Sequence, residues 1–344
     1  MTRQHATHTD ISEGWSLVDR LPARVASSCL YDSADWLRCW EDIGIEHRVR
    51  HGYVQADGPL GPAVLPLYAL TSSPFWHGYL VQTRQTWLGS RHAFAGSTYS
   101  MYAKRGPFPE ALARGAYATA MSWIEAGVAD LLVAPNLTAE AVTTWEAAVG
   151  PATGQVLLDR TYSCELSGDF AEYLGRLPAK LGRDVQRRLR RGRERGLRVR
   201  MLEGPEAQAL VPSALPLTIG TTDEHGWPPL YDEETLHCLL RVPGALLVAA
   251  QVNGQLVGVF FGFRHEAEVT FLCGGVDYSS LTEFSSYVAL MYRCTEWACD
   301  NGFRRIEWGR DNYRFKERHG LTGTDLWALV YAPPDEEPGL RNAL

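Results

Sequence analysis

The sequence repeats itself at long range, and this repetition constrains the fold more than any other feature. The segments Val54–Leu60 and Ala250–Leu256 align at an offset of 196 residues, and each holds an Asp-Gly or Asn-Gly turn signal after an apolar run. In both halves a tryptophan-containing helical pattern ends at a glycine and is followed by an apolar strand. A chain of 344 residues is also about twice the usual domain length of roughly 100–200 residues. We therefore expect two similar domains, over residues 1–155 and 156–344.

The second half shows the expected order of elements more clearly. Residues 245–276 predict three antiparallel strands, with Asn253-Gly254 as the first turn and Gly274-Gly275 ending the third strand. A capping box from Ser280 to Glu283 is expected to open the next helix, and a strand over 303–308 follows that helix. The pattern predicts an α/β (α+β) fold in which each domain is a mixed, largely antiparallel sheet flanked by helices.

Positive charge is concentrated in one short segment. The net charge of the chain is −7, yet residues 176–200 contain eleven basic and two acidic residues. Apolar residues recur at i+4 from Leu177 to Leu189, which predicts an amphipathic helix over 178–195 that ends at Gly196. The cations expected on its opposite face are Lys180, Arg183, Arg187, Arg190 and Arg191. Like charges this close need water or an anionic partner, so the helix is either a donor phosphate site or a solvated or salt-bridged charged face.

Composition excludes several other classes of protein. Hydrophobic residues make up 45% and charged residues 21% of the chain, and no apolar run approaches the ~18 residues of a membrane span. The N-terminus lacks the apolar segment of a secretory signal. Seven scattered cysteines without a C-x-x-C pair predict reduced thiols in the cytoplasm. The pairs His5/His8 and His47/His51 lack a third ligand nearby, so no metal is expected, and no cofactor is predicted.

Several of these patterns together resemble one family. The segments that carry the resemblance are the Lys-x-x-Arg helix ending at Gly196, the tail Gly274-Gly275-x-Asp277-Tyr278 … Trp308-Gly309 … Lys316 … Gly320, and, in the first half, Tyr31-x-x-x-x-Trp36-Leu37 with Leu65-Pro66-Leu67. They resemble the double-domain GNAT-type acyltransferases related to the Fem peptidyltransferases. The resemblance implies that an acceptor amine attacks an activated acyl carbonyl, with negative charge developing on the carbonyl oxygen. The donor is acyl-coenzyme A in ordinary GNAT enzymes and aminoacyl-tRNA in the Fem branch.

The segment expected to hold the donor phosphates favours the second kind of donor. Coenzyme A users typically carry an Arg/Gln-x-x-Gly-x-Gly/Ala turn at a helix N-terminus. Residues 274–280 lack that pattern and place the carboxylate of Asp277 there, and Thr83–Gly89 in the first half does not match it either. Together with the basic helix, this predicts aminoacyl-tRNA as the donor. An acyl-coenzyme A N-acyltransferase and a non-catalytic RNA-binding module stay open as alternatives, and the acceptor could be a small metabolite, a peptide intermediate or a cell-wall precursor.

Candidate site residues lie in the second half. The resemblance implies that Lys316 stabilises the donor phosphate or the developing oxyanion, whereas its position among charged residues also fits a surface lysine. His225 and Asp277 are candidate proton acceptors, with a surface loop and a turn carboxylate as the plainer interpretations. The residues predicted to bind the acceptor are Asp223, Glu224, Trp227, Tyr278 and Tyr313. Of these, the first three share the loop 221–229 with His225, and Asp223 or Glu224 are further candidates to relay the proton of the amine.

Overall fold

The chain divides into two compact units. A computed structural model describes residues 9–10, 14–23, 25–27, 29–58, 61–73, 76–77, 91–96, 109–226 and 231–332. Unit 1 comprises Met1–Thr161 and Thr324–Leu344, and unit 2 comprises Tyr162–Gly323. The two boundaries between the units fall inside strands, one in β7 (Gly154–Glu165) and one in β13 (Thr322–Tyr331). The expected boundary at 155/156 therefore falls inside β7, and the last strand returns to unit 1 because β13 pairs with β6 (Leu131–Leu137).

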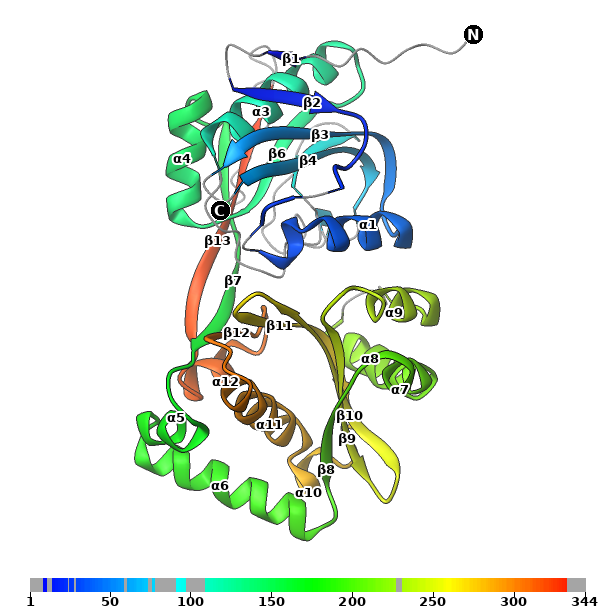
Figure 1. Ribbon diagram of the computed structural model, residues 1–344, viewed down its shortest axis with the longest axis vertical. Coiled ribbons are helices and arrows are strands. Elements are labelled where there is room, and N and C mark those ends of the chain that lie inside the picture. The colour runs from blue at the N-terminus through cyan, green and yellow to red at the C-terminus, as the bar shows by residue number, and fades with distance from the viewer. Residues whose placement is uncertain are drawn as a thin grey trace. The chain divides into compact units, whose positions relative to one another are not determined.

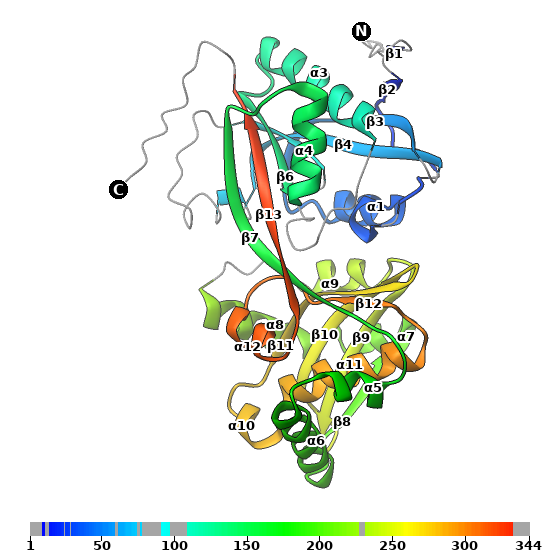
Figure 2. The same cartoon turned by 90° about the vertical axis from the view of Figure 1, so that its left-hand side faces the viewer.

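Unit 1 is a mixed sheet with helices on both faces (Figures 1 and 2). Its strands follow the order β1-β2-β3-β4-β5-β6-β13, and only β5 and β6 pair in parallel. The bounds are β1 Thr9–Asp10, β2 Trp15–Val18, β3 His47–Gly58, β4 Gly61–Ser72, β5 His92–Ala95, η2 Leu30–Asp32, α1 Ala34–Ile43, α3 Glu110–Glu125 and α4 Ala139–Val149. Val54 and Leu65 share a buried core with α3 and α4. Their sequence neighbour Tyr53 and the cross-strand Tyr68 instead donate hydrogen bonds to Glu41 of α1, so α1 lies on the opposite face.

Unit 2 repeats this plan around the strands that continue the same hydrogen-bonded sheet, in the order β7-β12-β11-β10-β9-β8. The bounds are α5 Phe170–Arg176, α6 Ala179–Glu194, β8 Arg198–Leu202, α7 Gly204–Ala209, α8 Val211–His225, α9 Glu233–Leu239, β9 Ala245–Val252, β10 Gln255–His265, β11 Glu268–Val276, α10 Leu281–Phe284, α11 Ser286–Asp300, β12 Arg305–Glu307 and α12 Tyr313–Arg318. Figure 1 shows α5, α6 and α11 on one side of this sheet and α7, α8 and α9 on the other. The core between α11 and the sheet includes Leu290, Cys294 and Phe260.

The structure confirms the predicted fold class and the internal repeat. In unit 1 the β3–β4 hairpin is followed by β5, α3 and the parallel strand β6. In unit 2 the β9–β10 hairpin is followed by β11, α11 and the parallel strand β12. The turn at Asn253-Gly254 has φ values of 50° and 81°, a left-handed conformation that asparagine and glycine tolerate best. The Asn-Gly pair thus predicted the hairpin correctly, because these two residues tolerate the left-handed conformation that the turn requires.

Several predicted boundaries are correct and others are wrong. The basic helix was expected over 178–195 and is α6, Ala179–Glu194. The capping box from Ser280 to Glu283 does not open the long helix, because Ser285 adopts a φ of 53° and separates the short α10 from α11. Gly274-Gly275 does not end the third strand, since β11 continues to Val276. Within the described part of the chain, no helix combines the length and apolarity that crossing a bilayer requires.

Candidate active site in unit 2

The two parallel strands of unit 2 separate halfway along β11. The pairing of β11 with β12 ends at Thr270 and Glu307, while β11 continues to Val276 along β10. Leu272 is an extra residue in β11 opposite the Phe261–Gly262 step of β10, which makes a β-bulge at this point. Beyond Thr270 no described strand pairs with the β12 side of β11, so no strand satisfies the backbone groups on that edge.

Aromatic rings and glycines shape the region where the strands part. The ring of Trp308, directly after β12, stacks on Phe271 with centroids 4.7 Å apart. A Cβ atom on Gly275 would lie 2.2 Å from the backbone carbonyl of Leu217 in α8. A glycine is therefore required there, because α8 lies directly against the strand. The glycine pair was expected to end the strand, and in the structure Gly275 allows α8 to pack against β11.

Asp277 shapes the turn that follows β11. Its carboxylate accepts hydrogen bonds from the backbone N–H and hydroxyl of Ser279, at 3.0 and 2.6 Å, and from the hydroxyl of Ser280 at 2.7 Å. These bonds, those from Ser279 first, lower the pKa of Asp277. A general base near neutral pH needs a raised pKa, so this geometry favours the turn-carboxylate interpretation of Asp277 over the catalytic one.

The cations of α6 remain largely exposed. Arg187 pairs with Asp184 on its own helix, Arg188 bonds the same carboxylate at 2.7 Å, and Arg190 lies 3.9 Å from Glu194. The side chains of Arg187 and Arg190 are each 65% exposed. We call the exposed cations of this helix the basic ridge, and define it as Lys180, Arg183, Arg187 and Arg190.

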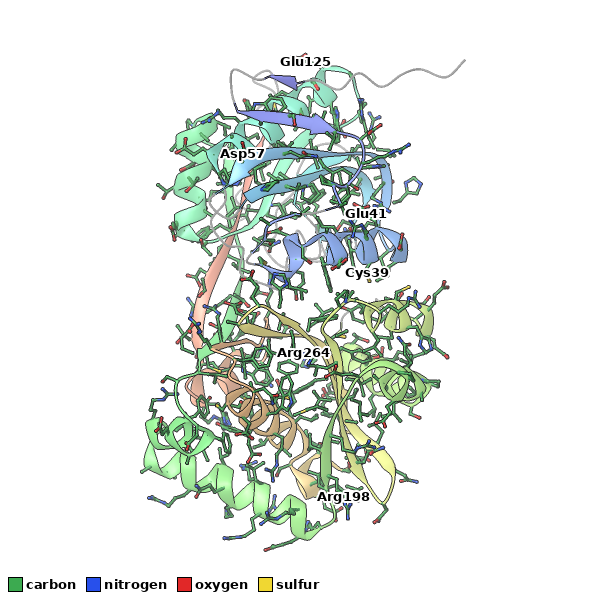
Figure 3. The ribbon with its side chains drawn as sticks, viewed as in Figure 1. Cys39, Glu41, Asp57, Glu125, Arg198 and Arg264 are labelled. Carbon is green, nitrogen blue, oxygen red and sulfur yellow. The ribbon has the colours of Figure 1, made fainter. Side chains whose placement is uncertain are left out.

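Acidic residues from elsewhere in the chain do not cover the basic ridge. Among the described residues no carboxylate forms an ion pair with Lys180 or Arg183, and Arg198 on the edge strand β8 (Figure 3) also has none. Arg191, predicted for the same face, is partly buried and donates a hydrogen bond of 3.1 Å to the hydroxyl of Ser285. The ridge is therefore anchored at the start of α11 and stays available to an anion.

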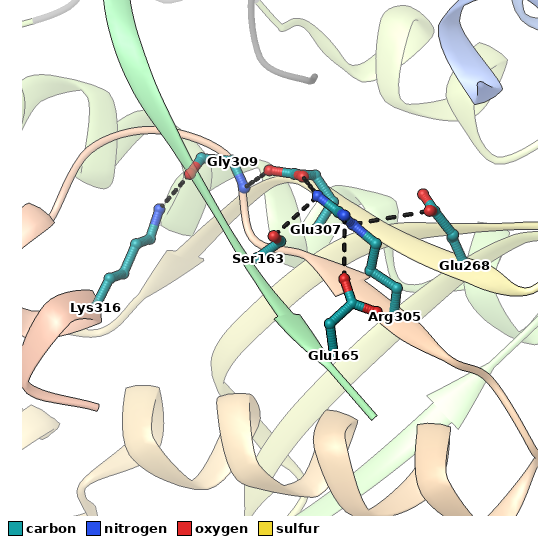
Figure 4. Close-up of polar contacts among 7 residues, drawn as sticks. All are labelled: Ser163, Glu165, Glu268, Arg305, Glu307, Gly309 and Lys316. Carbon is teal, nitrogen blue, oxygen red and sulfur yellow. Dashed lines mark hydrogen bonds and ion pairs between the residues drawn. The ribbon is translucent and has the colours of Figure 1, made fainter. Parts of the chain in front are cut away.

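Lys316 is buried and hydrogen-bonded to the backbone. It is 3% exposed, so the surface-lysine interpretation is wrong. Its ammonium donates to the carbonyl oxygen of Gly309 at 3.0 Å (Figure 4). It also donates to the carbonyl oxygens of Trp308, at 2.8 Å, and Arg310. All three N–H donors of the ammonium thus have backbone acceptors. In this structure Lys316 fixes the segment after β12 rather than presenting its charge to a phosphate.

A second polar group at this position was not predicted from the sequence. Arg305 is surrounded by Glu165 at 3.1 Å, Glu307 at 3.4 Å, Glu268 at 3.7 Å and the hydroxyl of Ser163 at 2.9 Å (Figure 4). These partners come from three neighbouring strands, β7, β11 and β12. The alternation of charged and apolar residues in Arg305-Ile-Glu307 indicates a strand. It does not show which strands lie on either side, and so it does not predict the partners of Arg305.

The predicted acceptor residues fall in two places. Asp223, Glu224 and His225 are exposed in the last turn of α8, which is helical up to Gly226, so the prediction of a loop is wrong for these residues. None of the three side chains bonds another described residue. Trp227 lies outside the described residues. Tyr278 lies apart from these residues, directly after β11, and is 39% exposed.

Tyr313, the last of the predicted acceptor residues, lies after the end of β12. It begins α12, is 43% exposed, and its ring lies 6.1 Å from that of Tyr162. Tyr287, in the first turn of α11, is hydrogen-bonded by the side chain of Asn312 and interacts electrostatically with Tyr278. Burial raises the pKa of Tyr287 to about 12, so its hydroxyl keeps its proton. The structure therefore brings Tyr278, Tyr287 and the segment before Tyr313 together.

Of the two histidine pairs with metal-like spacing, the structure describes His47 and His51. His47 bonds the hydroxyl of Thr71 at 2.7 Å, His51 packs edge-on against Tyr53, and His5 and His8 lie outside the described residues. In the ranges that the structure describes, no three His, Cys, Asp or Glu side chains gather as a metal site requires.

Comparisons with known proteins agree with this geometry. The sequence profile of the acetyltransferase (GNAT) domain family matches residues 179–317. The crystal structure of FemX matches with a TM-score of 0.60 at 10% identity, covering 89% of this chain and 92% of that chain. The C-terminal domain of a putative lysylphosphatidylglycerol synthetase from Agrobacterium fabrum gives 0.53 at 12% identity, covering 87% of each chain. L-PGS from Bacillus licheniformis gives 0.53 at 9% identity, covering 90% and 95%. No curated protein matches the sequence.

The fold and these matches define a class of protein. The chain is a tandem GNAT-fold protein whose second unit contains a GNAT acetyltransferase domain. It shares its fold with FemX over most of its length, as the sequence resemblance implied, and the domain match supports an acyltransferase.

Proposed function

We propose that the chain is an aminoacyltransferase that forms an amide by moving an aminoacyl group from aminoacyl-tRNA to an amine. The observation that carries this proposal is the basic ridge on α6. Among the described residues Lys180 and Arg183 form no ion pair, and Arg187 and Arg190 pair only with Asp184 and Glu194 of their own helix and stay 65% exposed. Guanidinium groups on one helical face suit the phosphates of an RNA backbone. The ridge also ends beside Ser285, where Arg191 bonds the residue that precedes α11.

The segment after β11 supports this donor over coenzyme A. A pyrophosphate turn offers backbone N–H groups at a helix start. Here the segment carries the carboxyl groups of Asp277 and Glu283, and the N–H of Ser279, the serine nearest the strand, already bonds Asp277. A second candidate function, an acyl-coenzyme A N-acyltransferase, is favoured by the GNAT acetyltransferase profile over 179–317. Both functions use the same acyl chemistry.

In the proposed reaction the neutral amine nitrogen of the acceptor attacks the ester carbonyl of the donor. The new C–N bond forms, the C–O bond to the tRNA ribose breaks, and the proton lost by nitrogen ends on the ribose hydroxyl. Backbone N–H groups on the free edge of β11 beyond Thr270 are placed to donate to the developing oxyanion. The acceptor lies beside Tyr278 and Tyr313 in this proposal. Contributions from Asp223, Glu224, His225 and Trp227, at or just beyond the end of α8, stay a prediction.

The donor is tested by supplying amines with either charged tRNA or acetyl-coenzyme A, each with and without ribonuclease. Amide product that requires charged tRNA and disappears with ribonuclease supports the proposal. Product that requires the thioester and survives ribonuclease would replace it with the coenzyme A function. RNA binding without product from either donor would leave a non-catalytic RNA-binding module. The proposal places the reaction in the cytoplasm, in keeping with the seven free cysteines.

The basic ridge is tested by the double variant Arg187→Glu/Arg190→Glu. If each arginine contacts one phosphate, the slope of log binding constant against log salt concentration falls by about two, and affinity for tRNA drops about tenfold or more at low salt. Arg38→Glu/Arg114→Glu is the matched control, because it changes two exposed arginines of unit 1 by the same charge. Equal salt slopes in the two double variants would show that the ridge does not bind the donor.

A further inference from the structure

The segment between β12 and α12 is held in place from both of its ends. We call residues 308–312 the 308–312 loop. Lys316 donates to the carbonyl oxygens of residues 308, 309 and 310 from the α12 side. From the strand side, Glu307 accepts a hydrogen bond of 3.3 Å from the backbone N–H of Gly309. Both groups are buried, with Lys316 3% and Glu307 3% exposed, so water does not compete with these bonds.

The loop needs this support because its backbone is strained. Asp311 and Asn312 follow one another with φ values of 63° and 53°, in the left-handed region that residues with a side chain rarely adopt. Consecutive conformations of this kind persist where surrounding contacts enforce them, and they concentrate at functional sites. Here the result is that Asn312 reaches the hydroxyl of Tyr287 and Tyr313 begins α12 with an exposed ring.

Arg305 connects this loop to the sheet. It pairs with Glu307 on its own strand and with Glu268 and Glu165 directly across from it on the two neighbouring strands. The side chain of Arg305 is 16% exposed and that of Glu307 is 4% exposed, whereas that of Glu165 is 73% exposed. The pair Arg305–Glu307 thus forms the buried part of the network and Glu165 its solvent rim. Figure 4 shows the continuous path from Glu268 through Arg305, Glu307 and Gly309 to Lys316.

We propose that the 308–312 loop and Tyr313 form the acceptor-contacting wall of the active site, and that Glu307, fixed by Arg305, is the residue that positions this wall. The inference rests on the proposed function for its acceptor, an amine. Glu307 does not touch the substrate in this account, because its carboxylate binds protein groups, Arg305 and the N–H of Gly309. The wall lies where β11 and β12 part, next to Trp308, so it borders the edge of β11 proposed to hold the carbonyl.

The first test measures the loop directly and does not depend on turnover. Hydrogen exchange of the full chain is followed by mass spectrometry for wild type, Glu307→Leu and Glu307→Gln. Loss of the buried acceptor in Glu307→Leu is expected to speed exchange in peptides covering 308–313 by about tenfold or more. Glu307→Gln keeps an oxygen for the N–H of Gly309 and is expected to recover most of the protection. Glu165→Gln, which alters the exposed partner of the same arginine, is the matched control and should exchange like wild type.

The second test measures the acceptor. With charged tRNA as donor, Glu307→Leu is expected to raise KM for the amine about fivefold and to leave KM for charged tRNA unchanged. Glu307→Gln is expected to bring the amine KM most of the way back to the wild-type value, and Tyr313→Ala is expected to raise the amine KM as well. Unchanged exchange in Glu307→Leu would overturn the positioning role. Faster exchange with an unchanged amine KM would overturn the acceptor role of the wall. If wild type transfers nothing from either donor, the proposed function fails, while the exchange result still decides whether Glu307 positions the loop.

Discussion

His319 makes the stability of unit 2 depend on pH below 6.5. Its side chain is 6% exposed, its Nδ1 bonds the hydroxyl of Tyr292 at 2.7 Å, and its ring stacks on Phe315 at 4.0 Å. Burial, followed by the charges of Arg318 and Arg188, lowers the pKa of His319 from 6.5 to about 4. The imidazole is therefore neutral in the folded protein at pH values where the unfolded chain already binds a proton.

The sign and size of the effect follow from this difference. Above pH 6.5 neither state is protonated at His319, so its contribution to stability is fully present there. As pH falls below 6.5, protonation favours the unfolded chain, and this stability is lost progressively until the folded pKa of about 4. Each pKa unit corresponds to 1.36 kcal/mol, so the free energy of unfolding decreases by about 2 kcal/mol at pH 5 and by about 3 kcal/mol at pH 4. This is a large part of a typical total of about 5–15 kcal/mol.

The assay is urea unfolding at pH 7, 6 and 5, followed by circular dichroism. His319→Phe removes the ionisable group and keeps an aromatic ring against Phe315, so its free energy of unfolding is expected to lack the loss of about 2 kcal/mol between pH 7 and pH 5. His225→Gln, a change at an exposed histidine, is the control and should keep the wild-type pH dependence. If His319→Phe and wild type lose stability equally over this range, the reasoning about His319 is refuted.

Two further substitutions test packing at the site by chemical denaturation. Lys316→Met leaves three buried carbonyl oxygens without their donor and is expected to lower the free energy of unfolding by about 3–5 kcal/mol, whereas the exposed Lys180→Met should change it by less than about 0.5 kcal/mol. Similar losses in both would contradict the assigned contacts. Gly275→Ala in β11 places a Cβ atom 2.2 Å from the backbone of Leu217 in α8 and is expected to lower the free energy of unfolding by about 1–3 kcal/mol. Gly220→Ala is the control: it lies in α8, its Cβ atom would meet nothing within 4 Å, and it should leave the free energy of unfolding unchanged or raise it. A harmless Gly275→Ala would show that α8 is not packed tightly on β11.

Local signals in the sequence predicted the elements whose formation depends on neighbouring residues. The basic helix was placed within one residue at each end, because apolar spacing and Gly196 are both local. The Asp169 carboxylate caps α5 by accepting a 2.8 Å hydrogen bond from the N–H of Glu172, three residues later. The end of α8 was interpreted as a loop because Gly226 and the prolines after it are strong turn signals, but they act only beyond His225.

The buried polar groups were not predictable in the same way. Arg305 bonds Glu165, 140 residues earlier in the chain, and pairs with Glu268 on a strand that precedes α11. Lys316 was noticed only through a family resemblance, and the sequence gives no sign that its ammonium binds the carbonyl oxygens of a loop. Charged residues are read as exposed unless a partner is known. The partner is set by strand order, which local patterns do not encode.

Under the proposed function, the start of α11 links the two substrates. Arg191 of the basic helix bonds Ser285 at 3.1 Å, and two residues later Tyr287 is bonded by Asn312 of the 308–312 loop. Ser285 itself is 5% exposed and strained at a φ of 53°, so this turn is fixed by its contacts rather than by its own conformational preference. Ser285, which binds Arg191 of the basic helix, and Tyr287, which binds Asn312 of the 308–312 loop, therefore lie in the same turn of backbone. A donor held by the ridge would meet an acceptor wall whose position is set from the same residues, which is the geometric requirement for bringing an ester carbonyl and an amine together.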